Sequence, residues 1–171
     1  MDKPIVTWYT QDNTEQVLSH DFEVVDAGTI SQPVGFLIWN NRGGNEDVSD
    51  MTHCSFETRD NAGGLTGELV EDNWIEVHSV QLDELDEDDN PIFFPVGADE
   101  SGEALGHMVG AVLGVDDDTG EPMGIIRGGA NDGTKQNAPD NFAEVLVRAH
   151  IPELASAGAV DFRLRIFYRY V

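Results

Sequence analysis

The sequence consists of short runs of strand-forming residues, and clusters of Gly, Asn, Asp and Pro separate each run from the next. The runs cover residues 4–10, 21–25, 34–40, 51–58, 73–82, 91–96, 123–127, 142–150 and 160–171. Short runs bounded by turn residues predict an all-β chain. A single open sheet of so many strands would leave one apolar face in water, so we expect two packed antiparallel sheets.

The final run, residues 160–171, has the clearest period of two. Apolar or aromatic residues fill one set of alternate positions, namely Val160, Phe162, Leu164, Ile166, Tyr168 and Tyr170. The other set is Asp161, Arg163, Arg165, Phe167 and Arg169. Because successive side chains of a strand point to opposite faces, we expect a core face and a cationic face. Residues 34–39 are apolar at both sets of positions, which predicts a central strand covered on both sides.

Nothing in the sequence divides the chain, since no linker, repeat or low-complexity tract interrupts it. We therefore expect one domain over residues 1–171. Residues 104–115 are compatible with a short helix, but each glycine there costs a helix about 1 kcal/mol relative to alanine. A bulged strand is the alternative. Residues 151–158 predict a single helical turn closed by Gly158.

Acidity is the strongest compositional signal, with 33 Asp and Glu residues against 9 Lys and Arg, and a net charge of -24. Nucleic acid is an improbable partner, because phosphate binding needs clustered cations. The only lysines are Lys3 and Lys135, and this profile resembles that of proteins from extreme halophiles. Molar salt shortens the Debye length to roughly 3 Å and screens such self-repulsion. The alternative is an ordinary acidic protein from a mesophile.

We expect neither a membrane span, a secretory signal nor a disulfide within the chain. The longest apolar run is far below the roughly 20 residues of a membrane span, and the sequence begins Met1-Asp2-Lys3-Pro4 without the apolar region of a secretory signal. Cys54 is the only cysteine. It can form no disulfide within the chain, and we expect it to be a small core residue.

No catalytic motif is present, so we do not expect an enzyme. The five histidines lie in five different segments, without the spacing of a zinc site, and no nucleophile elbow or phosphate loop occurs. The only site candidates are carboxylates in residues 83–90 and 116–121, which offer oxygen ligands for Ca²⁺ or Mg²⁺. The candidate ligands are Asp86, Asp88, Asp116 and Asp118. In so acidic a chain, solvated charge runs are the alternative. We expect no other cofactor.

The basic residues are unevenly placed, because Arg148, Arg163, Arg165 and Arg169 all lie near the C-terminal end. Arg163, Arg165 and Arg169 share one face of the last predicted strand. They predict an interface with acidic residues of another subunit, and the alternative is pairing across the sheet within one chain.

Residues 20–33 and 36–41 resemble the opening of immunoglobulin-like domains, in which a Phe-containing strand ends at a glycine turn and the next strand ends in Asn. Gly28 can adopt positive φ at that turn, and the side chain of Asn40 or Asn41 can close the strand end. The fold class implied is an antiparallel β-sandwich, immunoglobulin-like or jelly-roll-like, with long acidic loops and little helix. Residues 83–90 and 97–106 have no counterpart in that pattern.

The same opening, with an arch at residues 151–164, resembles small virion proteins of tailed phages and viruses, especially those of tails and baseplates. The resemblance implies a non-enzymatic structural protein that is assembled in the host cytoplasm and carried in the virion. Its partners would be other virion proteins and further copies of itself, without nucleic acid or membrane. The alternatives are an acidic DNA mimic and a cation- or carbohydrate-binding module, for which the candidate stacking residues are Trp39, Trp74, Tyr168 and Tyr170.

Overall fold

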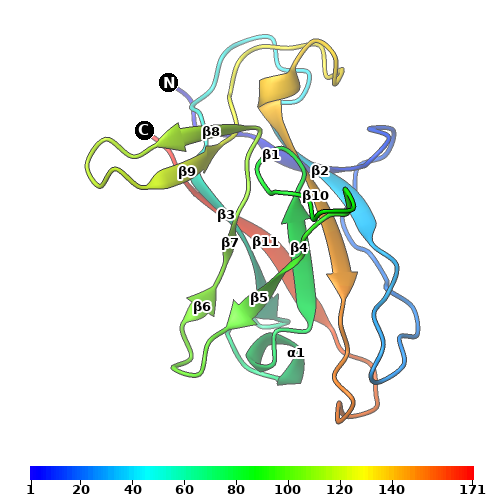
Figure 1. Cartoon of the computed structure of the whole chain (residues 1–171). Helices are drawn as coiled ribbons and strands as arrows, with labels where there is room; N and C mark the ends of the chain where they lie inside the picture. Colours follow the sequence, from blue (N-terminus) through cyan, green and yellow to red (C-terminus); the bar gives the residue numbers. More distant parts are fainter.

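The computed structural model describes residues 1–171 and consists almost entirely of antiparallel strands (Figure 1). The largest sheet contains, in spatial order, β1 (Val6–Thr10), β2 (Val34–Asn40), β10 (Phe142–Ala149), β4 (Ile75–Ser79), β5 (Phe94–Ala98) and β6 (Ala104–Leu105). A second sheet contains β11 (Phe162–Arg169), β3 (Thr52–Asp60) and β7 (His107–Met108). The third sheet is a projecting hairpin of β8 (Val112–Val115) and β9 (Pro122–Ile125). The predicted all-β, antiparallel sandwich is confirmed.

Helix is limited to one turn of α-helix, α1 (Glu68–Glu71), and one 3-10 turn, η1 (Pro139–Asn141). No helix has the length and apolar character needed to cross a membrane. Residues 104–115 form β6, β7 and β8, so the strand alternative was right there. The helical turn predicted for residues 151–158 was wrong. These residues form a non-helical turn, in which the Ala155 N–H bonds the Pro152 carbonyl.

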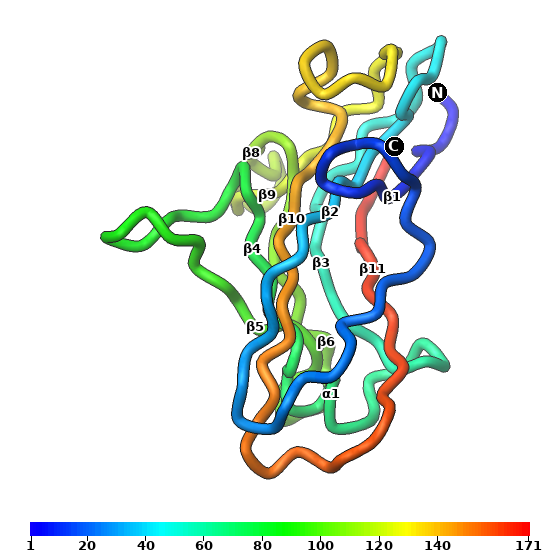
Figure 2. The backbone as a smooth tube through the Cα atoms, turned by 90° about the vertical axis from the view of Figure 1, so that its right-hand side faces the viewer, coloured from blue at the N-terminus to red at the C-terminus, as the bar shows by residue number.

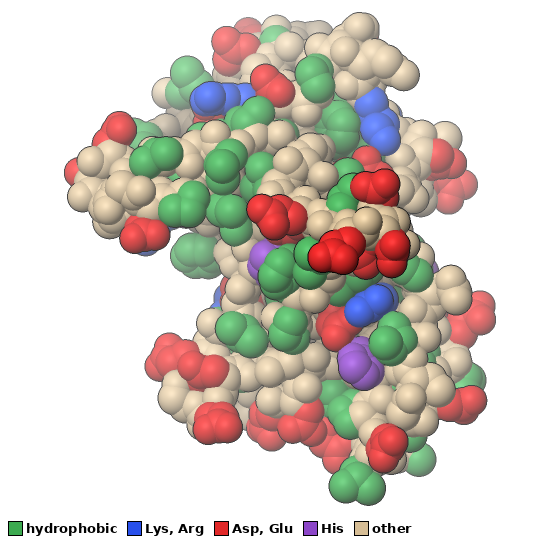
Figure 3. All heavy atoms as spheres, viewed as in Figure 1, with side chains coloured by type: hydrophobic (Ala, Val, Ile, Leu, Met, Phe, Trp, Pro, Cys, Tyr) green, Lys and Arg blue, Asp and Glu red, His purple; other side chains and the backbone are tan.

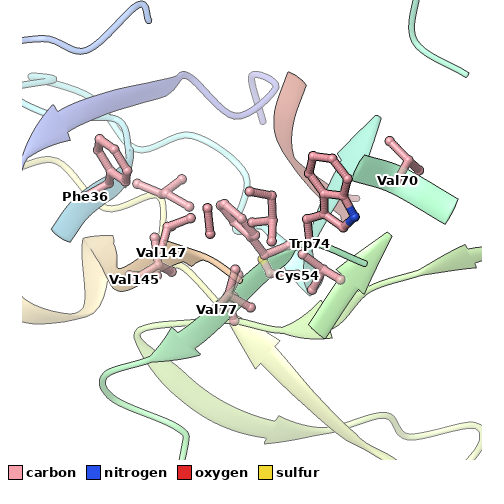
Figure 4. Close-up of a cluster of buried hydrophobic side chains, with 14 of the residues drawn as sticks. Phe36, Cys54, Val70, Trp74, Val77, Val145 and Val147 are labelled. Carbon is pink, nitrogen blue, oxygen red and sulfur yellow. The ribbon is translucent and has the colours of Figure 1, made fainter. Parts of the chain in front are cut away.

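The main core lies between the six-stranded sheet and the sheet of β3 and β11 (Figure 4). It contains Cys54 and Phe56 from β3, together with valines from β4 and β10. The central position predicted for residues 34–39 is confirmed, since β2 lies between β1 and β10. One face of β2 sends Phe36 and Ile38 into this core, while the other packs Leu37 and Trp39 against a smaller apolar cluster. Alternation places these neighbours in different clusters.

The strand predicted for residues 21–25 is absent, and this prediction was wrong. The Asp21 carboxylate accepts a hydrogen bond from the Glu23 N–H at 2.7 Å, and Glu23 has a φ of 58°. This local turn replaces extended backbone. The glycine turn that follows is confirmed: Gly28 has a φ of 75° and donates its N–H to the Ile151 carbonyl.

Asn40 and Asn41 close the end of β2, although not by the local turn that was expected. Both are buried, and their side-chain amides reach across to other loops. Asn40 Nδ2 donates to the carbonyls of Ser49 and Ile126, at 3.0 and 3.3 Å. Asn41 Nδ2 donates to the Gly128 carbonyl at 3.0 Å. The two amides therefore join the loop after β2 to the loop after β9.

Candidate functional site

The outer face of the sheet formed by β3 and β11 gathers four of the chain's nine basic residues. In the register of the two strands Arg163 lies opposite Arg59, Arg165 opposite Glu57, and Arg169 opposite Thr52. We call the set Arg59, Arg163, Arg165 and Arg169 the arginine face. The alternation of β11 produces it, because Phe162, Leu164, Ile166 and Tyr168 turn inward and pack on the core. The predicted division of β11 into a core face and a cationic face is confirmed.

The two ends of the last predicted strand differ from expectation. Val160 and Tyr170 lie just outside β11 and are 45% and 52% exposed, so neither is core.

Glu57 is the single carboxylate that neutralises the arginine face. Its side chain is only 6% exposed, and it accepts hydrogen bonds from Arg165 Nε and Arg59 Nη2, each at 3.0 Å. Arg163 and Arg169 are exposed and form no ion pair. Of the three predicted interface residues, Arg165 therefore serves the fold of its own chain, whereas Arg163 and Arg169 are free for a partner.

β11 is also the edge of its sheet, since β3 is its only neighbour. No segment outside β3 forms a backbone–backbone hydrogen bond with β11. Its inward side chains, such as Leu164 and Ile166, are only half-buried, so the core is open along this edge. Natural proteins usually protect such edges, because unpaired strand backbone can pair with another chain.

A cleft of about 800 Å³ lies beside the first half of β11. Residues 17–23 form its other wall, and the chain from β1 to β2 runs alongside β11 (Figure 2). Aromatic rings from both walls meet there, because Phe22 stacks on Phe162 with ring centroids 6.2 Å apart. Trp8 and Phe36 line its floor. The free edge and an aromatic cleft thus form one continuous surface.

The four predicted cation ligands lie in two turns, and the carboxylates of Asp86 and Asp116 hold the backbone of these turns. Asp86 accepts hydrogen bonds from the N–H groups of Asp88 and Asn90, at 2.9 and 2.8 Å. Asp116 accepts from the N–H groups of Asp118 and Thr119, at 2.8 and 2.9 Å.

Asp116 also bonds His53, which lies at positive φ beside the irregularity in the pairing of β3 and β11. The Thr119 N–H, followed by the His53 bond, lowers the pKa of Asp116 to about 2. Nowhere do three or more His, Cys, Asp or Glu side chains converge in a way that could hold a metal ion. The geometry therefore lends the cation prediction no support.

Two of the predicted stacking aromatics are unavailable to a ligand, since Trp39 and Trp74 are 0% and 4% exposed. Trp39 packs against Phe142 in the smaller cluster. Tyr170 is half-exposed and lies near Tyr168, with ring centroids 6.2 Å apart.

The acidic side chains on the face drawn in Figure 3 are spread over several loops, and few basic groups accompany them.

One polar cluster was not found by sequence reasoning. The Asp83 carboxylate lies 2.8 Å from His107 Nε2 and accepts the Ser79 N–H at 2.6 Å. The His107 ring stacks on Phe94, with centroids 4.2 Å apart. Buried His78 lies beside Asp83 and bonds a backbone carbonyl. The cluster joins β4, β5 and β7, and no spacing in the sequence signals these contacts.

No family model, no curated protein and no solved structure matches this chain.

Proposed function

We propose that this protein is a non-enzymatic structural protein of a tailed-virus particle. It belongs to the tail, baseplate or adsorption apparatus, or decorates the capsid, and it acts by binding further copies of itself and neighbouring virion proteins. The buried, unpaired Cys54 fits this role. A sandwich without disulfides suits a protein that folds in the reducing host cytoplasm and is later exposed on a particle.

One observation carries the assembly function: exposed arginines and a free strand edge coincide on β11. In a chain with a net charge of -24, this surface attracts acidic partners, whereas most other surfaces repel them. Arg163 and Arg169 are available because no carboxylate of their own chain pairs with them. Backbone groups along the edge add directional hydrogen bonds to that attraction.

The acidic composition supports a virus of a halophilic host. Acidic surface groups keep a protein soluble in molar salt, and screening removes much of the self-repulsion that they cause in dilute buffer. Assembly in such salt relies on apolar contact and strand pairing as well as on charge. The half-buried inner side of β11 offers the apolar contact, and its free edge offers the strand pairing.

The test is the molar mass of the purified protein by light scattering in about 0.1 to about 3 M KCl. We expect the native chain to form oligomers, and negative-stain electron microscopy to show rings or other symmetric particles. The variant Arg163→Ser/Arg169→Ser removes two charges from the arginine face and should weaken assembly. The matched control, Lys3→Ser/Lys135→Ser, removes two charges elsewhere and should assemble normally. A native chain that is monomeric throughout, or two variants that behave alike, would overturn the proposal.

The alternatives have weaker support. A carbohydrate-binding module needs exposed stacking rings, and Trp39 and Trp74 are buried. A cation-binding module needs converging ligands, whereas Asp86 and Asp116 bond their own turns. A DNA mimic needs carboxylates spaced along one exposed face, whereas many of these aspartates lie in separate turns and accept N–H bonds there.

A further inference from the structure

Residues 18–25, here called the open segment, leave most of their backbone hydrogen-bonding groups unused. No residue of the open segment takes part in a backbone–backbone hydrogen bond, and only the Glu23 N–H bonds a side chain. Both flanks are tied down: the Val17 N–H bonds the Trp8 carbonyl, and the Gly28 N–H bonds the Ile151 carbonyl. The open segment is therefore a loop with anchored ends and free backbone.

Two apolar side chains of the open segment are almost fully exposed. Leu18 and Val24 are 90% and 92% exposed, among the most exposed large apolar residues of the protein. Phe22 and His20 do pack on their own chain: Phe22 stacks on Phe162, and the His20 ring lies edge-on to Phe36 with centroids 5.5 Å apart. Isolated exposed apolar residues are common on protein surfaces, but here they belong to the segment whose backbone is unpaired.

Residues 21–24, Asp-Phe-Glu-Val, are the only four in the sequence in which two acidic residues alternate in this order with two apolar ones. In extended conformation this pattern places two carboxylates on one face and two apolar side chains on the other. β11 has the complementary pattern, with arginines outside and apolar residues inside. Opposite charges directly across a strand pair are favourable, and like charges are unfavourable.

The same rule argues against pairing β11 with β11 of another copy. An antiparallel pair centred on Ile166 places Arg163 opposite Arg169, and one centred on Arg165 places that arginine opposite itself. Two β11 edges therefore repel each other, and the edge of β11 fits an acidic strand better than it fits β11 of a second copy.

We propose that the free edge of β11 binds residues 21–24 of a second copy as an added strand. This inference rests on the proposed assembly function and names the contact through which it occurs. With Phe22 opposite Leu164, either strand direction places one of the carboxylates of Asp21 and Glu23 opposite the unpaired Arg163, and the other opposite Arg165, which also bonds Glu57. Phe22 and Val24 then cover the half-buried inner side of β11. Glu23 leaves its positive φ as the segment becomes extended.

The contact joins two different surfaces, the open segment of one copy and β11 of the next. After the first contact forms, the copy that gave its open segment still has a free β11, and the copy that gave β11 still has a free open segment. Head-to-tail contacts of this kind give closed rings or filaments rather than simple pairs. The order of the ring or filament follows from the angle between successive copies.

The test uses single cysteine substitutions in separate chains. Asp21→Cys, Glu23→Cys and Arg163→Cys are made individually, and Arg163→Cys carries a tag that changes its mass. Cys54 is 1% exposed and burial raises its thiol pKa to about 12. The native cysteine should therefore form no disulfide in this experiment. Opposite residues of paired strands lie close enough for a disulfide after small adjustment. Glu121→Cys, an exposed acidic position on the β8–β9 hairpin, is the matched control.

After mixing and mild oxidation, we expect a mixed disulfide dimer between Arg163→Cys and either Glu23→Cys or Asp21→Cys. It should exceed the dimer of Arg163→Cys with the Glu121→Cys control about tenfold or more, because the contact raises the effective thiol concentration. Linkage through Glu23 indicates an antiparallel pair, and linkage through Asp21 a parallel one.

A mixed dimer no more abundant than the control overturns the inference. A further variant that carries both Glu23→Cys and Arg163→Cys in one chain tests pairing within a copy, and a disulfide that forms only within single chains of this variant also overturns it. If the native chain oligomerises but no mixed dimer forms, the assembly function stands and this contact is wrong. If the native chain is monomeric under every salt condition, both fail.

Discussion

Arg165 donates from Nε to Glu57 Oε1 across 3.0 Å, and the Glu57 side chain is only 6% exposed. The Arg165→Ser substitution leaves this carboxylate with Arg59 alone. We expect it to lower the free energy of unfolding by about 1.5 to 3 kcal/mol, the usual range for a hydrogen bond to a charged group. Arg163→Ser removes an exposed, unpaired group and should change it by less than about 0.5 kcal/mol. Urea denaturation of both variants checks this; equal losses would contradict it.

The two faces of β11 should respond differently to a new charge. Leu164 packs against the main core, whereas Phe167 is 51% exposed on the opposite face. Leu164→Asp places a carboxylate among apolar side chains without a partner, and we expect loss of about 2 kcal/mol or more of stability, or of folding altogether. Phe167→Asp should leave folding nearly unchanged. Circular dichroism during thermal unfolding measures both, and a fully stable Leu164→Asp variant would reverse the assignment of faces.

The sequence predicted features that depend on local alternation. β11 was predicted because apolar positions repeat at strand spacing, β2 because its residues are apolar at both sets of positions, and Cys54 was assigned to the core because one thiol has no partner. Gly28 was assigned positive φ from the turn around it. In each case the residues that decide the structure are adjacent in the chain.

Features that depend on distant contacts were missed. The pattern at residues 21–25 indicates a strand, but a strand needs a neighbour, and within one chain Asp21 bonds the Glu23 N–H instead. The role of Arg165 depends on Glu57, which lies 108 positions away in the sequence. The cluster around Asp83 likewise joins three strands. Periodicity shows which face a side chain occupies, but not which residue lies across from it.

The turn at Gly28 provides a test of backbone strain. Gly28 has a φ of 75°, and a Cβ there would lie 3.2 Å from Glu153 Cγ. Gly28→Val should cost about 1 to 3 kcal/mol, because a β-branched residue is strained at positive φ. Gly28→Asn should recover much of this loss, since Asn tolerates the left-handed region. Ala27→Val, at an exposed neighbouring position, is the control. Thermal unfolding measures all three, and similar midpoints for Gly28→Val and Ala27→Val would exclude strain at this turn.

Salt should stabilise the folded chain. With a net charge of -24, self-repulsion opposes the compact state in dilute buffer. Raising KCl from about 0.1 to about 3 M shortens the Debye length from roughly 10 to roughly 3 Å and screens that repulsion. We expect the thermal midpoint, measured by circular dichroism, to rise across this range. A flat or falling midpoint would argue against adaptation to a halophilic host.

Acid should destabilise the protein through aspartates that hold their own turns. Asp60 accepts hydrogen bonds from Thr66 and from the Gly64 N–H, and these bonds lower its pKa from 3.8 to about 2. Because the folded-state pKa lies below the unfolded value, this contribution is complete above about pH 5 and is lost as the pH falls through about 2. In about 3 M KCl, where charge repulsion is screened, we expect the thermal midpoint to fall between pH 5 and pH 2. Asp60→Asn should start lower and fall less steeply, and parallel curves for the two proteins would show that Asp60 does not contribute.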